Sequence, residues 1–171
     1  SRDASRPAES NAQLRRAFAM MRPPGHHAES EGTGGFCLFN NVMVGVAHAQ
    51  AVHGLDRIAI MDFDVHHGNG GSEISWCDAT RLYVSSFEGG DVFGSGGVER
   101  GCDGMHGQIV SCPLPAGCGS VEFRAAWEHE LLPAVRAFEP EAIFLAAGFD
   151  GHADDPLASV QLHEDDFEWL T

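Results

Sequence analysis

Short apolar runs that alternate with helical stretches constrain the fold of this chain more than any other feature of its sequence. The runs occupy residues 57–63, 82–87 and 142–147, and each has the length and composition of a buried β-strand. Helical periodicity is found in residues 41–53, before the first run, and in residues 120–138, before the last. This alternation predicts an α/β fold in which helices cover both faces of a parallel sheet.

Several residues mark the expected ends of these helices. Gly54 is placed to end the first helix, because glycine readily adopts the left-handed backbone found at helix C-termini. Ser120 can cap the second helix, and Pro133 should kink it. The glycine-rich segment 89–107 lacks the Gly-Lys-Ser/Thr ending of a phosphate loop, so we expect a mobile loop at the rim of the sheet.

Length and charge narrow the classes of function. At 171 residues the chain suits one domain with a sizeable core, and we expect a polar leader at residues 1–20 followed by the domain at residues 21–171. The formal net charge of −15 disfavours nucleic-acid binding and suits a basic peptide or a cationic amine as partner. No apolar run approaches the roughly 20 residues that span a bilayer, so no membrane partner is expected.

The cysteines indicate a compartment but not a metal site. Their number is odd, and they form neither a Cys-x-x-Cys pair nor zinc-finger spacing: Cys37, Cys77, Cys102, Cys112 and Cys118. This pattern favours reduced thiols in an intracellular compartment, most simply the cytoplasm.

The most informative motif, Asp-Phe-Asp-Val-His-His-Gly-Asn-Gly at residues 62–70, directly follows the first predicted strand. In extended backbone, side chains two residues apart point the same way, so Asp62, Asp64 and His66 should share one side of the strand end. Ligands of open parallel sheets bind at this carboxyl edge, where a carboxylate and an imidazole make half of a zinc site. The alternative is a polar strand end with a capping aspartate and a surface histidine.

A second strand end offers another carboxylate. Asp150 follows the last apolar run and could complete an Asp-His-Asp set, which has the composition of a catalytic zinc site with one open position. Asp154 and Asp155, which precede Pro156, are more simply explained as a turn.

Adjacent histidines form the third motif. His26 and His27 follow a stiff Pro-Pro-Gly segment. Beside a metal-bound water they would be candidates for general base and general acid, and otherwise they are exposed surface histidines.

Together these motifs resemble those of the histone deacetylase and acetylpolyamine amidohydrolase superfamily, in the same order. The matching segments are residues 23–28 (Pro-Pro-Gly-His-His-Ala), 34–41 (Gly-Gly-Phe-Cys-Leu-Phe-Asn-Asn), 62–70 and 147–150 (Ala-Gly-Phe-Asp). Asn69, with the Pro-Pro-Gly segment, is more similar to the class II and bacterial branches than to class I. The resemblance implies an arginase/deacetylase-like α/β fold, and it implies that this chain is incomplete at both ends.

The resemblance also implies roles for individual residues. Zinc would be held by Asp64, His66 and Asp150, with the catalytic His26 and His27 flanking its water. Asp62 would orient His26, and Asn69 would support His27. Potassium is implied as a second cofactor, with Asp62 and Ser85 among its ligands.

Four further residues resemble the family's substrate channel. Gly35, Phe36 and Phe93 match positions that line a narrow passage for an acyl-lysine stem. Leu157 falls where polyamine-selective relatives carry a glutamate at the channel mouth, so an acetylated lysine peptide or protein is expected in preference to an acetylated polyamine. The alternative is that Leu157 packs the turn after Pro156.

One family feature has no counterpart in this sequence. The transition-state tyrosine lies downstream of the last zinc aspartate in the family, whereas the single tyrosine here, Tyr83, lies upstream of Asp150. A chain that only binds acyl-lysine, or an inactive fragment, is therefore an alternative to a zinc-dependent amidohydrolase. A two-metal enzyme of the arginase type is disfavoured, because Gly68 and His152 stand where it needs carboxylates.

Overall fold

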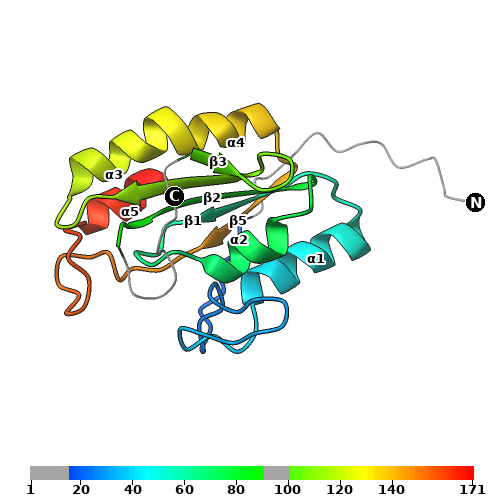
Figure 1. The fold of residues 1–171 in the computed structure, drawn as a ribbon, viewed down its shortest axis with the longest axis horizontal. Coiled ribbons are helices and arrows are strands. Elements are labelled where there is room, and N and C mark those ends of the chain that lie inside the picture. The colour runs from blue at the N-terminus through cyan, green and yellow to red at the C-terminus, as the bar shows by residue number, and fades with distance from the viewer. Residues whose placement is uncertain (1–15, 91–100) are drawn as a thin grey trace, which may run out of the picture.

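The computed structural model of the protein describes residues 16–90 and 101–171, and these build an α/β fold around a five-stranded sheet (Figure 1). The strand order is β3-β4-β2-β1-β5, and all neighbours run parallel except β3 and β4. The strands are β1 (Ile58–Asp62), β2 (Arg81–Glu88), β3 (Gly101–Asp103), β4 (Ile109–Leu114) and β5 (Ala142–Ala146). The expected sheet, parallel in the main, is confirmed.

Helices cover both faces of this sheet, as predicted. In Figure 1, α1 (Asn41–His53) and α2 (Asn69–Ser75) lie below the sheet. Above it lie α3 (Ser120–Ala126), a π-helical turn (Trp127–Leu131) and α4 (Leu132–Phe138), with α5 (Glu164–Leu170) on the same side. None of these helices in the described ranges is long and apolar enough to cross a membrane.

Helix α1 has the ends that the sequence predicts. The Asn40 side chain accepts a hydrogen bond from the Met43 N–H, which satisfies one of the free donors of the first turn. Gly54 adopts a left-handed conformation with φ 67°, and its N–H donates to the carbonyls of Ala49 and Gln50. Val46, in the middle of the apolar face, is fully buried.

The segment 120–138 is helical throughout, but its details correct the prediction. Gly119 rather than Ser120 is the N-cap, and the Ser120 hydroxyl instead donates to the Asp166 carboxylate at 2.7 Å. The π-helical turn comes immediately before α4, in whose first turn Pro133 lies. Pro133 cannot supply the N–H of a continuous α-helix, and the change to π-helical bonding comes just before it.

The glycine-rich segment also departs from expectation. Residues 101–103, within the predicted rim loop, form β3 and pair antiparallel with β4. The central part of that segment lies outside the described residues.

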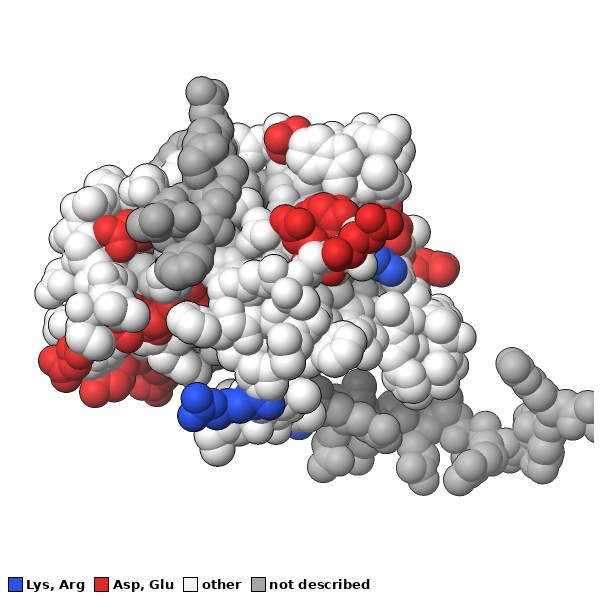
Figure 2. All heavy atoms as spheres, turned by 60° about the horizontal axis from the view of Figure 1, so that its bottom comes forward, with Lys and Arg blue, Asp and Glu red and all other residues white. Residues whose placement is uncertain are grey.

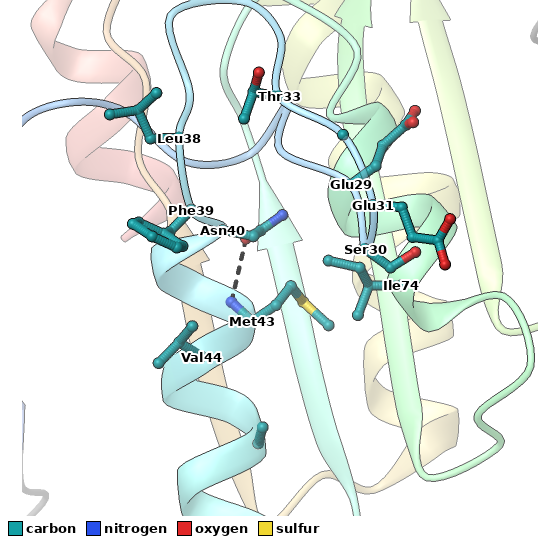
Figure 3. A pocket seen from close by; sticks show the side chains of 12 residues that line it. Glu29, Ser30, Glu31, Thr33, Leu38, Phe39, Asn40, Met43, Val44 and Ile74 are labelled. Atoms are coloured by element: carbon teal, nitrogen blue, oxygen red, sulfur yellow. Dashed lines mark hydrogen bonds between the residues drawn. The ribbon is translucent and has the colours of Figure 1, made fainter.

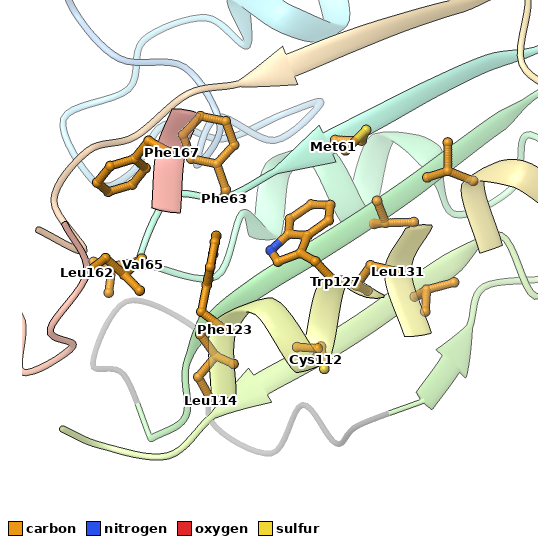
Figure 4. Close-up of a cluster of buried hydrophobic side chains, with 14 of the residues drawn as sticks. Met61, Phe63, Val65, Cys112, Leu114, Phe123, Trp127, Leu131, Leu162 and Phe167 are labelled. Carbon is orange, nitrogen blue, oxygen red and sulfur yellow. The ribbon is translucent and has the colours of Figure 1, made fainter. Parts of the chain in front are cut away.

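The larger core lies between the sheet and the α3–α4 side (Figure 4). Trp127 is fully buried against Phe123, and its indole N–H donates to the Ser86 hydroxyl at 3.0 Å. A smaller cluster on the other face packs α1 against β1, β2 and β4 through Met43, Val46, Ala49, Ile58, Ile60, Tyr83 and Ile109. Two apolar layers thus fix the strands whose carboxyl ends carry the motifs.

Candidate metal centre

Strands β1 and β5 bring the two aspartate motifs to one edge of the sheet. In their parallel register Asp62 pairs with Ala146, so the residues that follow each strand emerge side by side. Asp64 and His66 come from the β1 side and Asp150 from the β5 side, and one ligand atom of each lies within 4.8 Å of the others. The His66 Nδ1 is 2.8 Å from Asp150 Oδ2 and 3.2 Å from Asp64 Oδ1.

Backbone groups hold the two carboxylates in place. Asp64 Oδ1 accepts the His66 N–H at 2.9 Å, and Asp150 Oδ1 accepts the Val65 N–H at 3.2 Å. Gly148 leaves room for Asp64, because a Cβ at this glycine would lie 2.1 Å from Asp64 Oδ2. The chain therefore packs its backbone closely around the point where the ligand atoms meet.

The donor set of this cluster fits zinc. An imidazole nitrogen and two carboxylate oxygens, all half-buried, are ligand types that zinc accepts in sites with an open position. Hydrogen bonds from His66 to Asp150 and then to Asp64 raise the pKa of His66 to about 10, against the opposing effect of burial. A cation at this point would replace the proton that the three groups share.

His26 lies next to this cluster and is held by Asp62. Its Nδ1 is 3.0 Å from Asp62 Oδ2, and its Nε2 is 3.5 Å from Asp64 Oδ2. Burial by itself would lower the pKa of His26, but the charge and hydrogen bond of Asp62, with the charges of Asp64 and Asp150, raise it to about 9. His26 is thus suited to carry a proton.

His27 has the opposite tendency. Burial, and then the charge of His26, lower the pKa of His27, although a hydrogen bond to Asn69 partly offsets this. The His27 Nδ1 lies 2.7 Å from Asn69 Oδ1, and an amide oxygen can only accept, so this Nδ1 carries the proton and Nε2 the lone pair. The two histidine rings are 4.0 Å apart, centroid to centroid, so an imidazole suited to donate stands beside one suited to accept.

Tyr83 belongs to the same network, and the sequence did not point to this role. Its side chain is fully buried on β2, and its hydroxyl donates to Asp62 Oδ2 at 2.5 Å. The same carboxylate oxygen is hydrogen-bonded to His26 Nδ1, so Tyr83 and His26 both hold Asp62 in place. Two glycines near Asn69 leave room for the tyrosine, because a Cβ at Gly68 or Gly71 would lie within 2.3 Å of Tyr83. This contact joins two strands' surroundings that are far apart in sequence, so no local motif signals it.

Ser85, the expected potassium ligand on β2, pairs in register with Asp62. Its hydroxyl oxygen is buried and has no hydrogen-bond partner among the described residues. A buried hydroxyl without a partner is costly, which is consistent with a group that is missing from this position.

The expected channel residues lie in different surroundings, one packed against His27 and two exposed to solvent. Gly35 lies against His27: with φ 50°, its Cβ would come 2.1 Å from the His27 ring. The side chain of Phe36 is 83% exposed and that of Leu157 is 86% exposed, so Leu157 does not pack into the turn after Pro156. Phe93 lies outside the described residues.

A pocket of about 630 Å³ is separate from this cluster (Figure 3). It opens between the loop at residues 29–33, the start of α1 and Ile74 of α2, and none of the expected site residues lines it. On the face of the molecule that Figure 2 shows, acidic side chains gather in patches and Lys and Arg are few. The net charge of −15 implies such a surface.

Comparisons with known proteins identify the same group of proteins as the motifs. A sequence model described as "Histone deacetylase domain" matches residues 4–171. "Histone deacetylase 10, chloroplastic" of Oryza sativa subsp. japonica is 42% identical over 154 residues, which cover 90% of this chain and 35% of that protein.

Two crystal structures share the fold. The HDA15 HD domain superposes with a TM-score of 0.79 at 37% identity, covering 88% of this chain and 45% of that one. An acetylpolyamine aminohydrolase from Burkholderia pseudomallei gives a TM-score of 0.76 at 36% identity, covering 87% of this chain and 44% of that one. The chain thus spans less than half the length of these proteins.

Proposed function

The chain belongs to the histone deacetylase domain family, and from this premise we propose that it carries the metal centre of a zinc-dependent amidohydrolase acting on acetylated lysine. The observation that carries the proposal is the convergence of Asp64, His66 and Asp150 beside the His26–His27 pair. Deacetylase-type hydrolysis is supported by the family match and by the names of the relatives.

The residues of the site divide the proton transfers of amide hydrolysis between them. A zinc ion held by Asp64, His66 and Asp150 would polarise the acyl carbonyl and lower the pKa of its water to about 7. His27 would accept a proton at Nε2, because its Nδ1 proton is held by Asn69. His26 would protonate the departing amine, since Asp62 favours its charged form.

A potassium ion is proposed at Asp62 and Ser85. The support is the buried Ser85 hydroxyl without a partner, which lies beside Asp62 on the neighbouring strand. An alkali cation there would satisfy the hydroxyl oxygen and would offset part of the negative charge that Asp62 places under His26.

A non-catalytic protein that binds acyl-lysine is the second candidate, and Tyr83 is the observation that favours it. This single tyrosine of the chain is fully buried and donates to Asp62, so it cannot donate to an oxyanion as well. Preorganised oxyanion donors contribute on the order of 10²–10³ in turnover, so a protein in which no other group takes this role would bind acyl-lysine and turn it over slowly.

The test of the metal centre is the zinc content of the purified chain after dialysis against zinc-free buffer. We expect one tightly held zinc per chain in the wild type and its loss in Asp64→Ala. Asp103→Ala is the matched control, because Asp103 is an exposed aspartate at the end of another strand, outside the cluster. Tightly held zinc that survives Asp64→Ala would refute the assignment.

Acetyl-lysine peptide distinguishes the two candidate functions. The amidohydrolase predicts release of acetate from the peptide by the zinc-loaded protein. The non-catalytic candidate predicts saturable binding of the intact peptide, lost in Asp64→Ala, with no release of acetate.

A further inference from the structure

A second group of metal-ligating side chains lies outside the candidate centre. In the described part of the chain, His152, His163 and Glu164 each offer one ligand atom, and these atoms lie within 4.8 Å of one another. The two histidine rings meet edge to face, with centroids 5.9 Å apart. No step of the proposed hydrolysis uses these residues.

Backbone pairing holds the two histidines side by side. The Ala153 N–H donates to the Leu162 carbonyl at 2.8 Å, and the Leu162 N–H donates to the Gly151 carbonyl at 3.0 Å. These two bonds form a short parallel bridge between the loop after β5 and the residues before α5. His152 and His163 are therefore held together by the fold and not by a chance meeting of two flexible surface side chains.

The start of α5 is anchored as well. The His163 N–H donates to the Asp166 carboxylate at 3.0 Å, and Arg124 donates to the same carboxylate at 2.8 Å. Asp166 is fully buried, and Phe167 next to it packs into the larger core. His163 and Glu164 thus extend into solvent from a fixed backbone.

The ring of His152 lies between the third residue of the group and a nearby aspartate. Its Nε2 points toward Glu164, with Oε2 at 3.6 Å. Its Nδ1 accepts the Asp154 N–H at 3.1 Å, and Asp154 Oδ2 lies 3.9 Å away. Metal binding at Nε2 moves the ring proton to Nδ1, which then gives up the bond from the Asp154 N–H and can turn to the Asp154 carboxylate close by. A carboxylate behind a metal-bound histidine is the usual means of fixing its ring.

We propose that His152, His163 and Glu164 form a second metal site, one that takes a divalent transition ion such as Zn²⁺, Ni²⁺ or Cu²⁺. Imidazole nitrogens favour these ions, whereas Mg²⁺ and Ca²⁺ require oxygen ligands. The bound ion joins the loop that carries Asp150 to the start of α5. It therefore links the candidate centre to α5, which packs on the larger core through Phe167.

The site is tested by measuring zinc bound per chain at equilibrium over a range of free Zn²⁺. The wild type should show a tight class of site and a weaker class. His163→Ser and Glu164→Gln should remove the weaker class and keep the tight one. Serine is a good N-cap residue, so His163→Ser preserves the start of α5. His129→Ala, a change of an exposed histidine outside both clusters, should match the wild type.

Two further variants separate this site from the candidate centre. Asp64→Ala should lose the tight class and keep the weaker one, so failure of either assignment is seen independently of the other. Asp154→Ala should weaken the second site by about 10–100-fold, as loss of an outer carboxylate typically does. A wild type with one class of site, or a weaker class that survives His163→Ser and Glu164→Gln unchanged, would overturn the proposal.

Discussion

Substitution of Gly68 by alanine should damage the protein through one contact that the structure defines. A Cβ at this position would lie 2.0 Å from the Tyr83 hydroxyl oxygen and 2.4 Å from Asp62 Oδ2. Both side chains are almost fully buried, so neither can move into solvent. The φ of Gly68 is −77°, which other residues also adopt, so the cost comes from this contact and not from backbone strain.

The expected loss of stability combines two effects. Overpacking of a tight core costs about 1–3 kcal/mol, and loss of a hydrogen bond to a charged group costs about 1.5–3 kcal/mol. The new methyl group must push the Tyr83 hydroxyl from Asp62, so both costs arise together. We therefore expect Gly68→Ala to lower the free energy of unfolding by roughly 2.5–6 kcal/mol, a large part of the total for a domain of this size.

Urea unfolding, followed by circular dichroism, measures this loss. Gly32→Ala is the matched control, because the nearest atom to its added Cβ is the Glu29 carboxylate at 3.7 Å, and its stability should change by less than about 0.5 kcal/mol. In the double variant Gly68→Ala/Tyr83→Phe the closest clashing atom is gone, so the double variant should lose less stability than the sum of the single changes. Additive losses, or a Gly68→Ala variant as stable as the control, would refute the reasoning.

Other consequences concern pH and charge. Zinc must displace the proton of His66, whose pKa is raised to about 10, so calorimetric zinc affinity should rise about tenfold per pH unit between about pH 6 and 9, and a flat profile would contradict this. Burial would raise the pKa of Asp166, but its hydrogen bonds lower it, so its stabilising effect is present above the ordinary Asp pKa of about 4 and is lost as pH falls. Asp166→Asn should accordingly cost about 1–3 kcal/mol in urea unfolding at neutral pH and less at pH values below about 4, whereas an equal cost at both would contradict it. In an active enzyme that contains this chain, Leu157→Glu should shift the ratio of kcat/KM values toward acetylspermidine and away from an acetyl-lysine peptide by up to about fivefold, the worth of an exposed ion pair, and an unchanged ratio would exclude a role at the channel mouth.

The sequence predicted that Asp64, His66 and Asp150 converge, because parallel strands place their carboxyl ends together. The strands around Asp62 and before Asp150 are apolar and short, so their limits could be found to within one or two residues. Once Asp62 pairs with Ala146, the residues after both strands have to converge. Local pattern and tertiary structure agree here, which is why ligand residues far apart in sequence could be grouped without a structure.

Elements whose stability comes from tertiary contacts were not predicted. Helix α2 begins with Asn69-Gly-Gly, a poor start for a helix by intrinsic propensity. A Cβ at Gly70 would lie 2.1 Å from the Ala28 carbonyl oxygen, and one at Gly71 would lie 2.3 Å from the Tyr83 ring. Close packing requires these glycines. Similarly, β4 contains Ser111 and Pro113 and lacks a continuous apolar run, although its pairing with β2 buries most of it.

Asp62 explains why the motif at residues 62–70 needs more than its metal ligands. Its two oxygens accept from the Asp64 N–H, from Tyr83 and from His26, so this one carboxylate fixes a loop, a strand and a histidine. Gly68 leaves the space in which the Tyr83–Asp62 pair is accommodated. A chain with Asp64 and His66 but a larger residue at position 68 would keep two of the proposed zinc ligands and displace the group that holds His26. The fold of this site therefore needs the glycine, and its partner Tyr83 lies on a different strand, where no local motif can reveal it.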